Sequence, residues 1–294
     1  SALGTLDPEL ARRVGALTLR ARKTVEGLLT GIHRSPHRGA SVVFVEHREY
    51  KPGDDPRLLD WRAFARTDRH NIKRFEQETQ LRGTLVLDRS GSMAYGDKMQ
   101  HASTLLAALA YLLVNQGDAA GAMLVDDAVG DSLPARSRPA HLESVFRALS
   151  SPAREGHATD LQGALTAVAE RCGRRGVVMI ASDLLDLSDR ALDPLSTIVS
   201  RNNDVVVLHV MHPDELELPF EGPCRFVGLE GEEPLEADPA TVREGYQREL
   251  QAFLESCRRR CIGAGARYVL ARTDDPPEHT LAALLAGGRR GGWG

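Results

Sequence analysis

Three oxygen-bearing side chains follow a short apolar run in the first third of the chain. Asp88, Ser90 and Ser92 stand at alternate positions directly after residues 85–87. The apolar run is typical of a buried parallel strand, and Asp88 falls where such a strand reaches the carboxyl edge of its sheet. Ligands of open α/β sheets bind at that edge. Asp, Ser and Gly are also ordinary turn residues, so this spacing alone leaves a plain turn as an alternative.

Two more residues extend the pattern further along the chain. Thr159 precedes a helix expected over residues 160–172, and Asp183 follows a strand expected over residues 177–180. If the sheet is parallel, both residues reach the same edge as Asp88. The five side chains offer oxygen alone, which suits a hard cation such as Mg²⁺, with Mn²⁺ or Ca²⁺ as alternatives, rather than zinc or copper.

The five residues divide into two groups by their chemistry. The hydroxyls of Ser90, Ser92 and Thr159 can bind an ion directly, while Asp88 and Asp183 can hold those hydroxyls and bound waters in place. A site made mainly of neutral hydroxyls leaves a divalent ion short of negative charge. A carboxylate from a partner protein would then be a favourable sixth ligand, so the pattern predicts a binding site with a preference for acidic ligands.

Regular alternation of strands and helices would position these residues. Between residues 84 and 286 the sequence predicts strands over 84–88, 121–125, 177–180, 204–211 and 267–270, and helices over 97–116, 141–149, 160–172, 188–201, 238–261 and 280–286. Such alternation is typical of an α/β fold with a doubly wound, mostly parallel sheet and helices on both faces. We expect one large domain over 81–286, after an N-terminal helix and small β extension over 1–80, and before a disordered tail over 287–294.

The first 80 residues carry two features with more than one interpretation. A basic amphipathic helix over 5–32 favours packing by one face over lying on a membrane, and strands are expected over 41–45 and 72–79. From Arg57 to Arg74 there are six Arg or Lys against two Asp. We interpret this segment as a loop held by its own Arg–Asp pairs, with a nucleic-acid surface as the alternative.

Composition argues against several classes of protein. The 294 residues are 42% hydrophobic and carry a formal net charge of −4, which is ordinary for a soluble globular protein and gives no sign of a dedicated nucleic-acid or membrane binder. No apolar run approaches the roughly 18 residues of a spanning helix, and no signal-peptide core is found, so we expect a cytoplasmic location. The four cysteines lack zinc-site spacing and are expected to be reduced thiols.

The motifs resemble a known family. Asp88-Arg89-Ser90-Gly91-Ser92, Thr159 and Asp183 look like the three parts of the metal-ion-dependent adhesion site of von Willebrand factor A domains. The stretch from Arg48 to Ala63 narrows this further, because it is similar to a signature of a bacterial family of such proteins with a domain of unknown function, whose genes often neighbour MoxR-type AAA+ ATPases. The resemblance covers residues 30 to 285.

This resemblance implies a von Willebrand factor A-like, Rossmann-type fold and a metal-dependent protein-binding module. It further implies an adaptor in a MoxR-linked chaperone or assembly system, with the ATPase or its client as the partner. His157 and Ala158 depart from the pattern, because relatives tend to have glycines before the Thr-Asp pair.

Three functions remain to be weighed. The leading hypothesis is a non-enzymatic module that binds a partner carboxylate through Mg²⁺. The alternative is a Mg²⁺-dependent hydrolase, because an ion with open positions can activate water. Against it, the sequence has no paired-carboxylate, G-x-S-x-G or Walker pattern, and only a distant histidine such as His157 could serve Ser90 as a base. Nucleic-acid binding through Arg57–Arg74 ranks last.

Overall fold

A six-stranded sheet forms the centre of the molecule. The computed structural model describes residues 8–34, 48–49, 71–72, 80–126, 129–154, 160–185, 188, 190–229 and 233–286. The strands run in the order β10-β7-β6-β3-β4-β5, and every neighbouring pair is parallel except β4 with β5. Their bounds are β3 Arg82–Asp88, β4 Ala119–Val125, β5 Val129–Arg136, β6 Val177–Ser182, β7 Asp204–Met211 and β10 Arg267–Arg272. This confirms the predicted α/β fold with a mostly parallel sheet.

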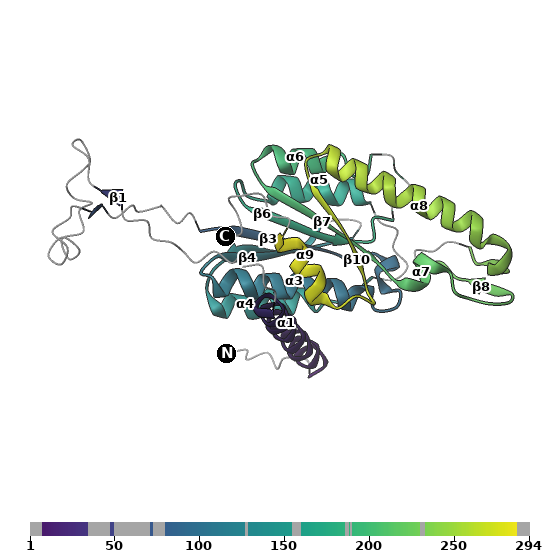
Figure 1. Ribbon diagram of the computed structural model, residues 1–294, viewed down its shortest axis with the longest axis horizontal. Coiled ribbons are helices and arrows are strands. Elements are labelled where there is room, and N and C mark those ends of the chain that lie inside the picture. Colours follow the sequence, from purple (N-terminus) through teal and green to yellow (C-terminus); the bar gives the residue numbers. More distant parts are fainter. Residues whose placement is uncertain are drawn as a thin grey trace.

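Helices cover both faces of the sheet (Figure 1). One face carries α5 (Leu161–Arg171), α6 (Pro194–Ser200) and α8 (Pro239–Gly263), and the other carries α1 (Pro8–Arg34), α3 (Lys98–Asn115), α4 (Pro139–Leu149) and α9 (Pro277–Ala286). Because side chains alternate along a strand, each strand feeds two separate cores. On β3, for example, Leu85 and Leu87 pack on the α3 side, and Val86 packs on the α5 side.

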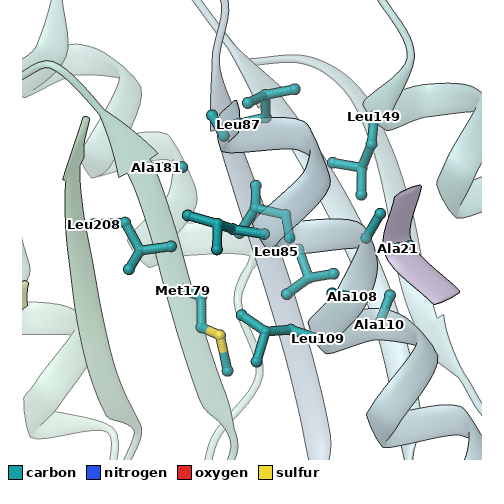
Figure 2. Packing of buried hydrophobic residues seen from close by; sticks show 14 of the residues in the cluster. Ala21, Leu85, Leu87, Ala108, Leu109, Ala110, Leu149, Met179, Ala181 and Leu208 are labelled. Atoms are coloured by element: carbon teal, nitrogen blue, oxygen red, sulfur yellow. The ribbon is translucent and has the colours of Figure 1, made fainter. Parts of the chain in front are cut away.

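The helix α3 is buried on nearly every side. Ala107, Ala108, Leu109 and Ala110 are four consecutive residues without exposed surface, which requires cover from two directions. The sheet covers one side of α3, and α1 covers another with Leu17, Ala21, Val25 and Leu28. Figure 2 shows Ala21 of α1 beside Ala108 and Ala110, with Leu85 and Leu87 of β3 in the same core. The predicted packing of the N-terminal helix by one face is confirmed.

Two elements differ from the sequence-based expectation. The strand β5 was not expected, since residues 129–136 lack a clear alternation of apolar and polar residues and contain Pro134. In the structure β5 pairs antiparallel with β4 at the edge of the sheet, where proline is tolerated. Gly121 of β4 allows this approach, because a Cβ there would lie 2.5 Å from the Leu133 carbonyl oxygen. The helix expected over 188–201 is shorter and begins at Pro194, since proline suits the first helical position.

The segment between β7 and α8 forms a small excursion from the sheet. It contains the short helix α7 (Pro213–Glu217) and an antiparallel hairpin of β8 (Cys224–Phe226) with β9 (Leu235–Ala237). In Figure 1 this arm lies at one end of the molecule, beside the start of α8. The proline- and glycine-rich composition of residues 213–234 is typical of such a surface excursion.

The rest of the N-terminal region is described only in part. The strand β1 (Arg48–Glu49) pairs antiparallel with β2 (Asn71–Ile72). The following lie outside the described residues: the strand expected over 41–45, the basic segment over 57–74 apart from residues 71–72, most of the strand expected over 72–79, and the tail over 287–294. Among the helices that the structure does describe, none combines the length and apolarity needed to span a membrane.

Candidate metal site

The carboxyl end of β3 carries the first three candidate residues. Asp88 is the last residue of β3, and the chain then enters the 3-10 helix η2 (Gly91–Ala94). Asp88 Oδ1 accepts a hydrogen bond from Ser90 N at 2.8 Å, which is an Asx turn. Ser90 Oγ and Ser92 Oγ then lie 3.1 Å apart. All three side chains are buried, so the local sequence produces a compact cluster of oxygen atoms.

The end of the neighbouring strand β6 adds Ser182 and Asp183 to this cluster. Ser182 Oγ donates to Asp88 Oδ2 at 2.5 Å and accepts from Leu184 N at 2.9 Å. Leu184 has a φ of 56°, which a leucine rarely adopts, and its buried side chain holds the turn in place. The strand order reverses at β3 and β6, so both carboxylates reach the crevice where open α/β sheets bind ligands.

The electrostatics of Asp88 favour a nearby cation. Burial, together with the charge of Asp183, raises the pKa of Asp88 to about 7, against the lowering effect of hydrogen bonds from Ser182 and Ser90. The side chain is only 1% exposed, so water contributes little to its solvation. A cation bound beside Asp88 would stabilise the charged carboxylate and lower this pKa.

Asp183 has a cationic partner that the sequence analysis missed. Lys98 Nζ lies 2.8 Å from Asp183 Oδ2 and 2.7 Å from Glu215 Oε1, and the Lys98 side chain is completely buried. Burial lowers the pKa of Lys98, but the two carboxylates outweigh this effect and the pKa lies above its ordinary value. One feature of the sequence could have indicated this partner. Lys98 begins α3 directly after the site loop, and a cation is unfavourable at a helix N-terminus, so a lysine there indicates negative charge nearby.

The other flank of the site holds two guanidinium groups around one buried carboxylate. Asp126 follows β4, and its Oδ2 accepts hydrogen bonds from Arg89 and Arg154, both at 3.1 Å. Arg154 N also donates to the Arg89 carbonyl oxygen at 2.7 Å, which ties the segment before Thr159 to the loop that carries Ser90. The Arg154 side chain is 53% exposed. This flank therefore presents positive charge to solvent beside the candidate site.

The geometry of the serines fits a magnesium ion. Magnesium binds oxygen at 2.0–2.1 Å in an octahedron, so adjacent ligands lie about 2.9 Å apart. The two serine oxygens, 3.1 Å apart, match one edge of such an octahedron. Within the described ranges no three His, Cys, Asp or Glu side chains cluster as metal ligands. An ion at this edge would therefore depend on hydroxyl and water oxygens, which suits a hard cation.

The structure brings together four of the five residues predicted for the site: Asp88, Ser90, Ser92 and Asp183. Thr159 lies outside the described residues, as do His157 and Ala158. The next residue, Asp160, caps α5 by accepting from Gly163 N at 2.8 Å. In the part of the chain that the structure describes, no histidine hydrogen-bonds to Ser90.

The class of protein follows from this arrangement: an α/β domain whose central strand delivers an oxygen cluster to the switch point of its sheet. The family model described as "Protein of unknown function DUF58" matches residues 46–254. The chain belongs to this family. An uncharacterised protein from Mycobacterium tuberculosis is 30% identical over 293 residues, which cover 97% of this chain and 92% of the relative.

Several solved structures share part of the architecture. BatB from Bacteroides thetaiotaomicron is 17% identical with a TM-score of 0.44, over 70% of this chain and 97% of that one. The SpRpn10 VWA domain is 14% identical with a TM-score of 0.37, over 68% and 94%. Proximal thread matrix protein 1 from the mussel byssus, with a zinc-occupied MIDAS motif, is 13% identical with a TM-score of 0.36, over 45% and 38%. At these values the likeness extends to the arrangement of sheet and helices and not to the site.

Proposed function

We propose that this protein is a non-enzymatic interaction module that binds a carboxylate of a partner protein through a divalent cation, with Mg²⁺ as the preferred ion. The observation that carries this proposal is the pair of serine oxygens, 3.1 Å apart, beside buried Asp88 at the carboxyl end of the central strand. Ser90, Ser92 and Thr159 would hold the ion, and Asp88 and Asp183 would orient hydroxyls and waters around it.

The chemistry of the site supports an acidic ligand. When bound, the ion supplies concentrated positive charge that neutral hydroxyls do not cancel, so an incoming carboxylate gains a strong ligand bond. Arg89 and Arg154 share Asp126 between them, and the half-exposed guanidinium of Arg154 adds positive charge on one flank. A carboxylate that approaches this edge therefore meets favourable charge before it reaches the ion.

The proposed partner is a MoxR-type AAA+ ATPase or its client, and the proposed location is the cytoplasm. The support for this partner is the similarity of residues 48–63 to the signature of a family that neighbours such ATPases. The metal-bridge proposal does not depend on it, since any protein with an accessible Asp or Glu side chain offers the required carboxylate.

A metal titration followed by a capture assay tests the proposal. Mn²⁺ is a paramagnetic stand-in for Mg²⁺, and its binding can be followed by electron paramagnetic resonance for the full chain and for Asp88→Ala and Ser90→Ala. We expect one site in the original protein and at least tenfold weaker binding in both variants. Ser200→Ala is the matched control, because Ser200 is an exposed helical serine that donates only to its own helix, at the Thr197 carbonyl oxygen.

The capture assay uses the same four proteins on an array of acidic peptides, in Mg²⁺ and in EDTA. We expect binding in Mg²⁺ that EDTA removes, that both site variants lack, and that Ser200→Ala retains. Equal binding by all four proteins in EDTA and in Mg²⁺ would show that the metal bridge is wrong.

A further inference from the structure

Lys98 lies beside the candidate site but is not among the residues proposed to hold the ion. Its ammonium group pairs with Asp183, which follows β6, and with Glu215, which lies on α7. Both ion pairs are close, at 2.8 and 2.7 Å, and the lysine side chain has no exposed surface. Because a buried charge is shielded little by water, Lys98 strongly affects the electrostatic potential at this edge of the sheet.

Glu215 is held in place by its neighbours. Because the same ammonium pairs with Glu215 and Asp183, a fixed Glu215 also keeps Lys98 beside Asp183. Glu215 Oε2 accepts from His212 N at 2.9 Å and completes a capping box at the start of α7. The Glu215 carbonyl oxygen accepts from Tyr246 OH of α8 at 2.5 Å. The neighbouring Asp214 accepts from Tyr95 OH at 3.1 Å, and Tyr95 directly follows η2. These contacts tie α7 to the site loop and fix the carboxylate that faces Lys98.

The lysine changes the charge that a metal ion meets. Without it, an ion at the serines would meet the charges of three carboxylates, those of Asp88, Asp183 and Glu215. With it, one fixed positive charge is shared between Asp183 and Glu215, so the net negative charge of this group falls from three to two. The ion then meets less negative charge and is also repelled by the ammonium, so it is held more weakly until a ligand adds a carboxylate.

We infer that Lys98 is a specificity-determining residue: by lowering the net negative charge beside the serines, it makes tight binding of the divalent ion depend on a carboxylate supplied by the ligand. This inference rests on the proposed function and deepens it. The protein holds the ion weakly when alone and firmly when an acidic group completes the site. Ion and ligand therefore bind cooperatively, and ligands without a carboxylate are rejected.

The test measures Mn²⁺ binding to the full chain by electron paramagnetic resonance, in chloride and in acetate buffers of equal ionic strength. Acetate serves as the carboxylate probe. We expect Lys98→Met to bind Mn²⁺ at least tenfold more tightly than the original protein in chloride, and to gain less from acetate. Lys98→Gln keeps a hydrogen-bond donor for Asp183 and replaces Lys98→Met if that variant does not fold.

A second variant changes the charge in the opposite direction. Glu215→Gln leaves Lys98 with one carboxylate fewer, so we expect Mn²⁺ binding to weaken at least threefold. Glu217→Gln is the matched control, because Glu217 lies on the same helix but pairs with Arg272, and its binding should equal that of the original protein. Opposite shifts for Lys98 and Glu215 separate an electrostatic role from a structural one, since a structural role predicts weaker binding in both.

The outcomes are distinct for the two proposals. If the Lys98 variant binds Mn²⁺ no more tightly than the original protein, or gains as much from acetate, the inference about Lys98 is wrong while the metal site stands. If Mn²⁺ binding appears only after Lys98 is replaced, in acetate as in chloride, both proposals are wrong, because a carboxylate then does not complete the site of the original protein. If no protein in the set binds Mn²⁺, both are wrong.

Discussion

Two buried groups near the site predict opposite effects of pH on stability. Burial and Asp183 raise the pKa of Asp88 to about 7, from an ordinary value of 3.8. Burial lowers the pKa of His209 on β7 to about 4, from an ordinary value of 6.5. His209 Nδ1 lies 2.7 Å from Tyr268 OH, and its ring packs against Phe253 of α8. Both side chains are essentially unexposed, so solvent screens neither effect.

The signs follow from which state binds more protons. Between pH 4 and 7 the folded protein keeps a proton on Asp88 that the unfolded chain has lost, so stability falls as pH rises, by about 4 kcal/mol over this range. Between pH 4 and 6.5 the unfolded chain protonates His209 while the folded protein does not, so stability rises with pH, by about 3 kcal/mol. In the original protein the two effects largely cancel.

Single variants should reveal each slope. Asp88→Asn removes the falling component and leaves that of His209, so the variant's free energy of unfolding should rise by about 3 kcal/mol from pH 4 to 6.5. His209→Gln removes the rising component and should show a fall of about 4 kcal/mol from pH 4 to 7. Urea unfolding in EDTA at half-unit pH steps measures both. Adding Mg²⁺ should stabilise the original protein more at pH 7 than at pH 4, because a cation favours the charged form of Asp88.

A matched control removes an exposed carboxylate. Asp193 is 54% exposed and pairs with Arg190 on the surface, so Asp193→Asn should follow the original protein across this pH range. The electrostatic reasoning fails if Asp88→Asn and the original protein give parallel curves between pH 4 and 7.

Three further substitutions and one comparison variant test the packing around the site by urea unfolding at pH 7. Leu28→Ala on α1 should cost roughly 2–5 kcal/mol, because Leu28 is 3% exposed in the core against α3; a cost below 1 kcal/mol would contradict the packing of α1 on the domain. Gly121→Val should destabilise the protein by roughly 1–3 kcal/mol, since its Cβ would press on the β5 backbone at Leu133. Gly130→Ala should cost less, because the nearest backbone atom is 3.6 Å from the added Cβ. Asp126→Ala should cost roughly 1–3 kcal/mol by leaving Arg89 without this partner, and an unchanged midpoint would contradict that role.

The elements that carry the site could be predicted because their signals are local. The apolar run before Asp88 determines β3, and the alternate placement of Ser90 and Ser92 determines the turn that joins their oxygens. The broad apolar face of residues 98–115 predicts α3 for the same reason. By contrast, β5 follows no local pattern, because an edge strand with a proline is stabilised mainly by its neighbour β4.

The partners of the site residues could not be predicted, because they are distant in sequence. Lys98 pairs with residues 85 and 117 positions away, and Ser182 donates to a carboxylate 94 positions away. A lysine at the start of an apolar helix indicates an unusual environment, but nothing near it in the chain identifies Asp183 or Glu215 as its partners. The same holds for Asp126, which joins two arginines from separate loops.

The sequence by itself determined the order of most strands and helices, the family, and an oxygen-rich turn at the end of the central strand. These features depend on residue type and on spacings of a few positions. Only the tertiary structure decided the charge of the site, because charge depends on which buried groups the sheet edge brings together. Among the described residues it placed the ammonium of Lys98 between Asp183 and Glu215 and no cation on Asp88, and this arrangement underlies the proposed need for a carboxylate from the ligand.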